Sequence, residues 1–83
     1  MPQLVHTVHA RLDGIIARET AAGVAFLVGD ATVWLPKSQL YSLVYYPRNT
    51  RSEDVRVGKR VRSVEIPDWL AREKGLEKLE DGA

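Results

Sequence analysis

The 83-residue sequence contains no cysteine, so neither a disulfide framework nor a thiolate-bound metal can stabilise it. It also has no apolar run near the roughly 18 residues that a membrane-spanning helix needs, and no charged-then-apolar start typical of a secretory signal. A chain of this length forms one domain and buries only about 60% of the surface that its unfolded form exposes. Oligomerisation is a remaining route to stability. We expect a cytoplasmic domain without membrane contacts.

Histidine is scarce as well, which argues against catalysis and metal binding. The only two, His6 and His9, are three residues apart, and in a strand such residues point to opposite faces. We expect His6 to be half-buried in the apolar register of that strand. The sequence has no G-x-S-x-G motif and no glycine-rich phosphate loop. We therefore predict a protein that is not an enzyme, with no catalytic residue, no metal site and no cofactor.

The net charge of +1 conceals an uneven distribution. Residues 48–62 carry six basic and two acidic side chains, for a balance of +4, whereas residues 63–83 carry three basic and six acidic ones, for −3. A basic segment followed by an acidic tail indicates an anion-binding face or subunits that meet through opposite charges. The alternative is a solvated surface of mixed charge.

The first half of the chain predicts strands joined by tight turns. Alternation over residues 4–12 indicates a strand, and Asp13-Gly14 is either a hairpin turn or a bend within one longer strand. The apolar run 24–28 and its partner 31–35 form the most definite hairpin. Pro36 ends this hairpin because proline cannot donate to a sheet; a turn or one helical turn follows it.

The second half predicts two more strands and the only helix. Residues 41–46 favour a strand, whereas residues 48–54 contain no apolar side chain and predict a loop. The next strand begins after a glycine-centred turn at Gly58. Its apolar positions change from odd to even numbers after Val61, so a bulge is expected near Arg62-Ser63. A helix is predicted over residues 67–75, ended by a left-handed glycine.

These elements predict a mainly β fold with one short C-terminal helix. Five or six short strands with tight turns indicate a small OB-like or SH3-like barrel, or a curled antiparallel sheet. We expect one domain over residues 1–79 and a frayed tail over residues 80–83.

Two stretches resemble a group of small uncharacterised proteins of tailed phages and prophages. The first is Val33-Trp34-Leu35-Pro36-Lys37-Ser38-Gln39, which matches a W-L-P-K-S-Q segment. The second runs from Val64 to Leu76 and is similar to a V-P-x-W-L-A-x-x-K-G-L helix. The resemblance implies phage origin and the host cytoplasm. It also weakly favours nucleic acid, because members of the group neighbour recombination and replication functions. The basic stretch around residues 41–60 and the N-terminal strand depart from the group's pattern.

Aromatic and basic residues occur close together in the middle of the chain. Rings beside cations hold single-stranded nucleic acid, because bases stack on the rings while cations contact phosphates. For Trp34 and Trp69 we favour burial in the core over this role, since each lies in an apolar run. Ser38 and Gln39 either contact a ligand or fasten a turn. The predicted nucleic-acid or anion-binding residues are Lys37, Tyr45, Tyr46, Arg48, Arg51, Arg56, Lys59, Arg60 and Arg62.

The sequence thus predicts a non-enzymatic phage accessory protein that binds nucleic acid, single-stranded by preference, or another phosphate-bearing ligand. The alternative is an oligomeric phage protein that captures a host nucleotide signal, or a host defence or polymerase protein. The small size and the oppositely charged segments favour this alternative.

Overall fold

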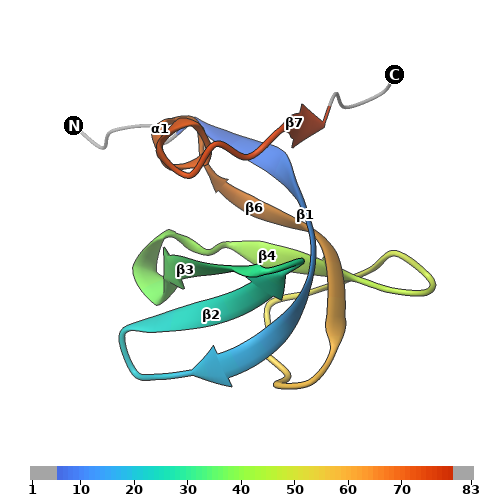
Figure 1. Cartoon of the computed structure of the whole chain (residues 1–83). Helices are drawn as coiled ribbons and strands as arrows, with labels where there is room; N and C mark the ends of the chain where they lie inside the picture. Colours follow the sequence, from blue (N-terminus) through green and yellow to red (C-terminus); the bar gives the residue numbers. More distant parts are fainter. Residues whose placement is uncertain (1–5, 80–83) are drawn as a thin grey trace.

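One long strand, β1, connects the two halves of a curled antiparallel sheet (Figure 1). The computed structural model describes residues 6–79. The strands follow the order β3-β2-β1-β6-β4-β5, and β7 pairs with β1. The elements are β1 (Thr7–Glu19), β2 (Gly23–Val28), β3 (Ala31–Pro36), the 3₁₀ helix η1 (Lys37–Gln39), β4 (Ser42–Tyr45), β5 (Thr50–Ser52), β6 (Arg60–Pro67), α1 (Asp68–Glu73) and β7 (Lys78–Leu79).

The sheet confirms the predicted mainly β fold in its curled form. The strands at its two ends, β3 and β5, do not pair with each other in the described part of the chain, so the barrel is not closed. The predicted β2–β3 hairpin is confirmed, and Pro36 lies at the end of β3 on the edge of the sheet.

The bend of β1 lies at Asp13 and Gly14, where the pairing register with β6 shifts. Of the two alternatives at Asp13-Gly14, a hairpin turn or a bend within one longer strand, the structure therefore shows the bend. A Cβ at Gly14 would lie 2.8 Å from the backbone oxygen of Leu27. Glycine thus permits the close approach of β1 to β2 at the bend.

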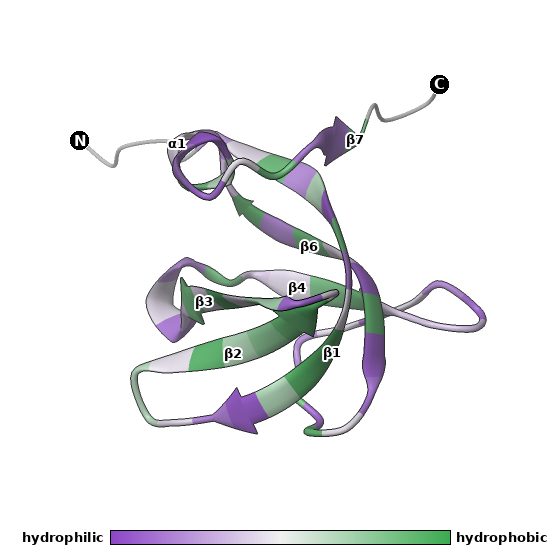
Figure 2. Ribbon diagram, viewed as in Figure 1, coloured by the Kyte–Doolittle hydropathy of each residue, from purple (hydrophilic) through white to green (hydrophobic). Residues whose placement is uncertain are grey.

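The core lies inside the curl and is built from the inward side of each strand. Figure 2 shows hydrophobic stretches along β2 and the adjoining part of β1, with hydrophilic residues interspersed elsewhere in the sheet. Each fully buried aliphatic or aromatic side chain contributes about 1.5–3 kcal/mol. The largest are Phe26, Ile16, Leu35, Leu43, Ile66 and Leu70.

The prediction that residues 48–54 form a loop is wrong, because part of this segment is a strand. Residues Thr50–Ser52 form β5, which pairs with β4 as a hairpin at the edge of the sheet. Its polar side chains are largely exposed, so no apolar pattern marks the strand. The predicted bulge near Arg62-Ser63 is confirmed, because the pairing of β4 with β6 passes from Val44↔Ser63 to Tyr45↔Val61.

Helix α1 begins after Pro67 and is followed by Gly75, which has the predicted left-handed conformation (φ 69°). Its buried residues are Leu70 and Ala71. Asp68 in the first turn accepts a hydrogen bond of 2.9 Å from Lys78 Nζ, which joins the helix to β7. None of the helices within residues 6–79 has the length and apolarity that crossing a membrane requires. The predicted frayed tail, residues 80–83, lies outside the described residues.

Both tryptophans lie at the surface, and the favoured prediction of core burial is wrong for each. Trp34 is 43% exposed and Trp69 is 54% exposed. Strand β3 directs Leu35 into the core, so alternation places Trp34 on the outer face. In α1 the adjacent Leu70 and Ala71 occupy the buried side instead of Trp69.

Candidate functional site

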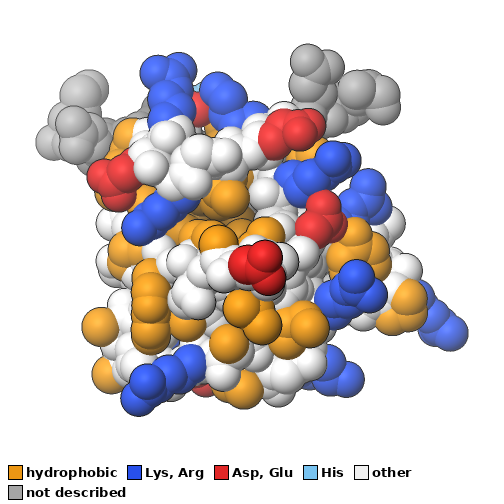
Figure 3. Space-filling model, viewed as in Figure 1, with side chains coloured by type: hydrophobic (Ala, Val, Ile, Leu, Met, Phe, Trp, Pro, Cys, Tyr) orange, Lys and Arg blue, Asp and Glu red, His pale blue; other side chains and the backbone are white. Residues whose placement is uncertain are grey.

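A hollow of about 400 Å³ lies beside the β4–β5 hairpin and the segment that leads into β6. Lys and Arg side chains extend from the right-hand side of the molecule around this hairpin (Figure 3). We call this concavity the basic hollow. Five of the nine predicted binding residues line it, together with Thr50 and Ser52: Tyr45, Tyr46, Arg51, Arg56 and Lys59.

Within residues 6–79, the cations of this region form no ion pair with a carboxylate. In the described part of the chain, all ion pairs with carboxylates involve four basic residues elsewhere, namely Arg11, Lys37, Arg72 and Lys78. The six remaining predicted cations form none of these ion pairs, so they add positive charge to this part of the surface. They are Arg48, Arg51, Arg56, Lys59, Arg60 and Arg62.

Three of these arginines are positioned by groups other than carboxylates. Arg51 Nη2 lies 3.1 Å from His9 Nε2, and Arg62 Nη1 donates a 2.9 Å hydrogen bond to Asn49 Oδ1. The guanidinium of Arg60 lies 5.5 Å from the centre of the Tyr46 ring, within the range of a cation–π contact. These contacts orient the side chains and leave their positive charges available to an anion.

Tyr46 offers an aromatic surface next to the cations. Its side chain is 40% exposed, and its hydroxyl donates a 2.7 Å hydrogen bond to Asp13 Oδ1 at the bend of β1. This hydrogen bond, with smaller contributions from burial and from the charge of Asp13, raises the pKa of Tyr46. The ring is therefore held in place while remaining accessible.

Tyr45 does not have the surface role that was predicted for it. It is 7% exposed and belongs to the core, so no base can stack on its ring. Its hydroxyl donates to the Asp54 backbone oxygen at 2.6 Å and accepts from the Arg56 N–H at 3.1 Å. Burial raises the pKa of Tyr45, although the Arg56 N–H opposes this effect. Tyr45 instead fastens the loop that carries Arg56.

Lys37, Ser38 and Gln39 lie on η1, apart from the basic hollow. Lys37 Nζ forms a 2.6 Å ion pair with Glu19, and both residues line a separate hollow that also contains Glu53 and Asp54. Within residues 6–79, the side chains of Ser38 and Gln39 form no hydrogen bond. The predicted alternative, in which they fasten the turn after β3, therefore has no supporting contact.

Glu65 on β6 connects β1 and β4 through hydrogen bonds that the sequence did not predict. It accepts hydrogen bonds from Thr7 Oγ1 at 2.9 Å and Ser42 Oγ at 3.0 Å. Burial alone would raise its pKa, but these two hydrogen bonds and the positive charges of His9 and Arg51 lower it overall. The contacts join residues 58 and 23 positions apart, and no local pattern signals them.

The two histidines differ in their surroundings. His6 precedes β1 and is exposed, so the prediction of a half-buried residue is wrong. His9 lies within β1, next to Glu65 in the register of the sheet. Across residues 6–79, no three histidine, aspartate or glutamate side chains gather in a way that could hold a metal ion.

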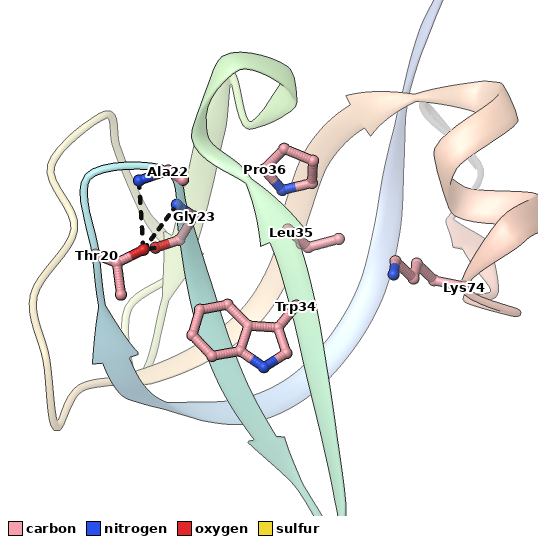
Figure 4. A pocket seen from close by; sticks show the side chains of 7 residues that line it. All are labelled: Thr20, Ala22, Gly23, Trp34, Leu35, Pro36 and Lys74. Carbon is pink, nitrogen blue, oxygen red and sulfur yellow. Dashed lines mark hydrogen bonds between the residues drawn. The ribbon is translucent and has the colours of Figure 1, made fainter.

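A second hollow, of about 300 Å³, surrounds Trp34 on the opposite part of the sheet (Figure 4). Trp34 lies across the outer side of the β2–β3 hairpin, and Lys74 extends from beyond the end of α1 toward Leu35. Thr20 Oγ1 accepts hydrogen bonds from the N–H groups of Ala22 and Gly23 at 3.3 and 3.1 Å and so fixes the turn at its rim. The lining is mostly apolar and has a single cation, Lys74.

Comparisons with models of protein families, with curated proteins and with solved structures find no match for this chain. The geometry and charge of its own residues are therefore the basis for assigning a function.

Proposed function

We propose that this protein binds nucleic acid, single-stranded in preference to duplex, at the basic hollow and the arginines around it. The observation that carries the proposal is that four cations lie with the exposed ring of Tyr46 and form no ion pair with a carboxylate within residues 6–79. They are Arg51, Arg56 and Lys59 in the basic hollow and Arg60 over the ring. We propose binding without catalysis, in which cations contact phosphates and the Tyr46 ring contacts a base.

The arrangement suits a flexible strand with unstacked bases. Phosphates contact Arg51, Arg56 and Lys59 around the hollow, while a base stacks on the Tyr46 ring. Base–aromatic stacking contributes about 1–3 kcal/mol per base, and a duplex cannot offer a base for it without unpairing. The curled antiparallel sheet is consistent with an OB-like fold. OB folds that bind single strands combine a basic groove with aromatic side chains on which bases stack.

The resemblance to phage and prophage proteins supports a role as a phage accessory protein in the host cytoplasm. A single-strand binder fits functions that expose single strands, such as recombination and replication. The basic segment, which departs from the pattern of that group, supplies the binding surface in this proposal and so distinguishes this chain from the proteins that it resembles.

Fluorescence anisotropy of labelled oligonucleotides tests the proposal. Log affinity for single-stranded DNA should fall with log salt by about 0.7 for each neutralised phosphate. Arg56→Glu with Lys59→Glu should lower affinity at least tenfold and reduce that slope by roughly 1.4, since two phosphate contacts are lost. Both side chains are exposed, and only the Arg56 backbone holds Tyr45, so the fold is retained.

The matched control reverses two charges elsewhere. Arg18→Glu with Lys74→Glu changes the net charge equally at exposed residues outside the hollow. If both double variants weaken binding equally, only net charge matters and the proposed site is wrong. If the unmodified protein does not bind oligonucleotides at low salt, the nucleic-acid function itself is wrong.

The alternative is capture of a single nucleotide by an oligomeric protein, and the volume of the basic hollow favours it. About 400 Å³ lies within the range of small-ligand pockets. Competition separates the two functions. A mononucleotide that displaces the oligomer at an equal concentration supports nucleotide capture, whereas displacement only by longer strands supports nucleic-acid binding.

A further inference from the structure

Strand β3 has a free edge that carries no charge. In the described part of the chain β3 pairs only with β2 and forms one end of the sheet. Its six residues, Ala31–Pro36, include no charged side chain. Native proteins usually protect such edges with lysine, proline or a covering segment, because a free edge pairs readily with another strand. Among the described residues, only the terminal Pro36 protects this edge.

The hydrogen-bonding direction of each β3 residue follows from its pairing with β2. Lys37 N–H donates to the Ala22 oxygen at 3.0 Å, which continues the hydrogen-bonded pairs of the β2–β3 ladder. Alternation along the ladder then directs the backbone groups of Leu35 and Val33 toward β2. The backbone N–H and C=O groups of Thr32 and Trp34 consequently point away from the sheet.

This free edge is complementary to itself. We infer that two copies of the chain pair through β3 in antiparallel orientation, with Val33 on the two-fold axis. In that register Thr32 of each copy lies opposite Trp34 of the other. Two such pairs form, and each exchanges two backbone hydrogen bonds. A register centred on Trp34 would require an N–H from Pro36, which has none.

Charges at the two ends of β3 favour the same orientation. Asp30 immediately precedes the strand and Lys37 immediately follows it. Antiparallel pairing about Val33 brings Asp30 of each copy near Lys37 of the other, whose Nζ also contacts Glu19 of its own copy. Parallel pairing would instead bring like charges together. Opposite charges at the ends of a pairing select its orientation and register.

The dimer also extends an apolar surface that is otherwise exposed. Ile15 pairs with Leu27 across β1 and β2, and both side chains are more than 40% exposed, as is Trp34. Hydrophobic side chains cover the part of the molecule occupied by β2 and β3 in Figure 3. Pairing places Trp34 of one copy against Thr32 of the other on this outer face, so the indole loses contact with water.

The absence of native cysteine allows a direct test with single-cysteine variants. Residues on the axis of a non-hydrogen-bonded pair have Cα atoms about 4.5 Å apart, which suits a disulfide. Val33→Cys should therefore form a covalent dimer as the main product under mild oxidation. Ala31→Cys is the control, because it is exposed but its two copies lie roughly 13 Å apart at 3.3 Å per residue.

Sedimentation of the unmodified protein and of two further variants completes the test. Thr32→Pro removes an outward N–H that has no partner within residues 6–79, so it should convert the dimer to monomer while circular dichroism stays unchanged. Leu27→Lys adds a charge one strand away from the edge and should leave the dimer intact. A monomer at all concentrations, equal cross-linking of Ala31→Cys, or dissociation by Leu27→Lys alone would each overturn the inference. None of these outcomes depends on binding of nucleic acid.

Discussion

The hydroxyl of Tyr46 donates a 2.7 Å hydrogen bond to Asp13, across 33 residues of sequence. The bond connects the end of β4 to the bend of β1, where Asp13 itself has a left-handed backbone (φ 50°). The guanidinium of Arg60 lies 5.5 Å from the centre of the same ring, which is 40% exposed. The bend of β1 therefore positions the ring to which the proposed function assigns base stacking.

Removing the carboxylate of Asp13 should change the ionisation of Tyr46. The hydrogen bond to Asp13 favours the protonated phenol and raises the pKa of Tyr46 above its ordinary value of 10.0. In Asp13→Asn the carboxylate charge is lost, so the phenol should ionise at lower pH. Ultraviolet difference absorbance over an alkaline titration measures this, and Tyr46→Phe identifies the signal. An unchanged titration in Asp13→Asn would show that the contact does not persist in solution.

Truncation of the Tyr46 ring should weaken binding of single strands. Tyr46→Ala removes a stacking surface worth about 1–3 kcal/mol, and roughly a 5- to 150-fold loss of affinity is expected. Tyr46→Phe keeps the ring and should retain most of the affinity. Tyr41→Ala is the matched control, because Tyr41 is also 40% exposed but lies outside the basic hollow. Equal losses in Tyr46→Ala and Tyr41→Ala would contradict stacking at Tyr46.

Adjacent residues on β2 should differ strongly in their effect on stability. Phe26 is completely buried, and Phe26→Ala should lower the free energy of unfolding by about 3–5 kcal/mol. Leu27 points outward and is 45% exposed, so Leu27→Ala should cost about 1 kcal/mol or less. Urea denaturation measures both.

If Phe26→Ala does not fold, Ile16→Val provides a milder test of the same core. Ile16 is also completely buried, and the loss of one methyl group should cost about 0.5–1.5 kcal/mol. A greater loss for Leu27→Ala than for either core variant would show that the register of β2 is inverted.

The sequence predicted those features that depend on neighbouring residues. The β2–β3 hairpin is marked by its alternation and turn, and the cluster of Arg51, Arg56 and Lys59 by proximity along the chain. Strand β5 was missed because its polar residues pair through backbone groups, which leave no hydropathy signal. An edge hairpin of this kind is recognised only when its partner strand is known.

Two predicted site residues are misplaced, for different physical reasons. Tyr45 faces inward because it lies two residues after buried Leu43, and alternation along β4 places both side chains on the core side. Lys37 is close to the basic segment in sequence, yet the fold brings it to Glu19 instead. The supporting roles of Asp13, His9 and Glu65 arise from contacts between distant strands, so inspection of local motifs could not reveal them.

Acidification should reveal the contribution of Glu65 to stability. Burial raises the pKa of Glu65, but the hydrogen bonds from Thr7 and Ser42, together with nearby positive charges, have the larger combined effect. The pKa therefore lies below its ordinary value of 4.5. A carboxyl group whose pKa is lower in the folded state stabilises the fold above its unfolded pKa, and this contribution is lost as pH falls through the folded pKa. Glu65→Gln lacks this titration. The difference in free energy of unfolding between the unmodified protein and Glu65→Gln should therefore be largest near neutral pH and shrink on acidification.

Ser42→Ala extends the same test. Loss of the 3.0 Å hydrogen bond should raise the folded-state pKa of Glu65, so the acid-induced loss of stability attributable to Glu65 should begin at higher pH. Urea denaturation at a series of pH values gives the free energy of unfolding of all three proteins. Other carboxylates also titrate in this range, including Asp68, whose pKa is lowered too. Subtraction of the Glu65→Gln curve removes their contribution. If the difference between the unmodified protein and Glu65→Gln is constant with pH, Glu65 does not hold these hydrogen bonds in its charged form. The network that links β1, β4 and β6 behind the basic hairpin would then need a different description.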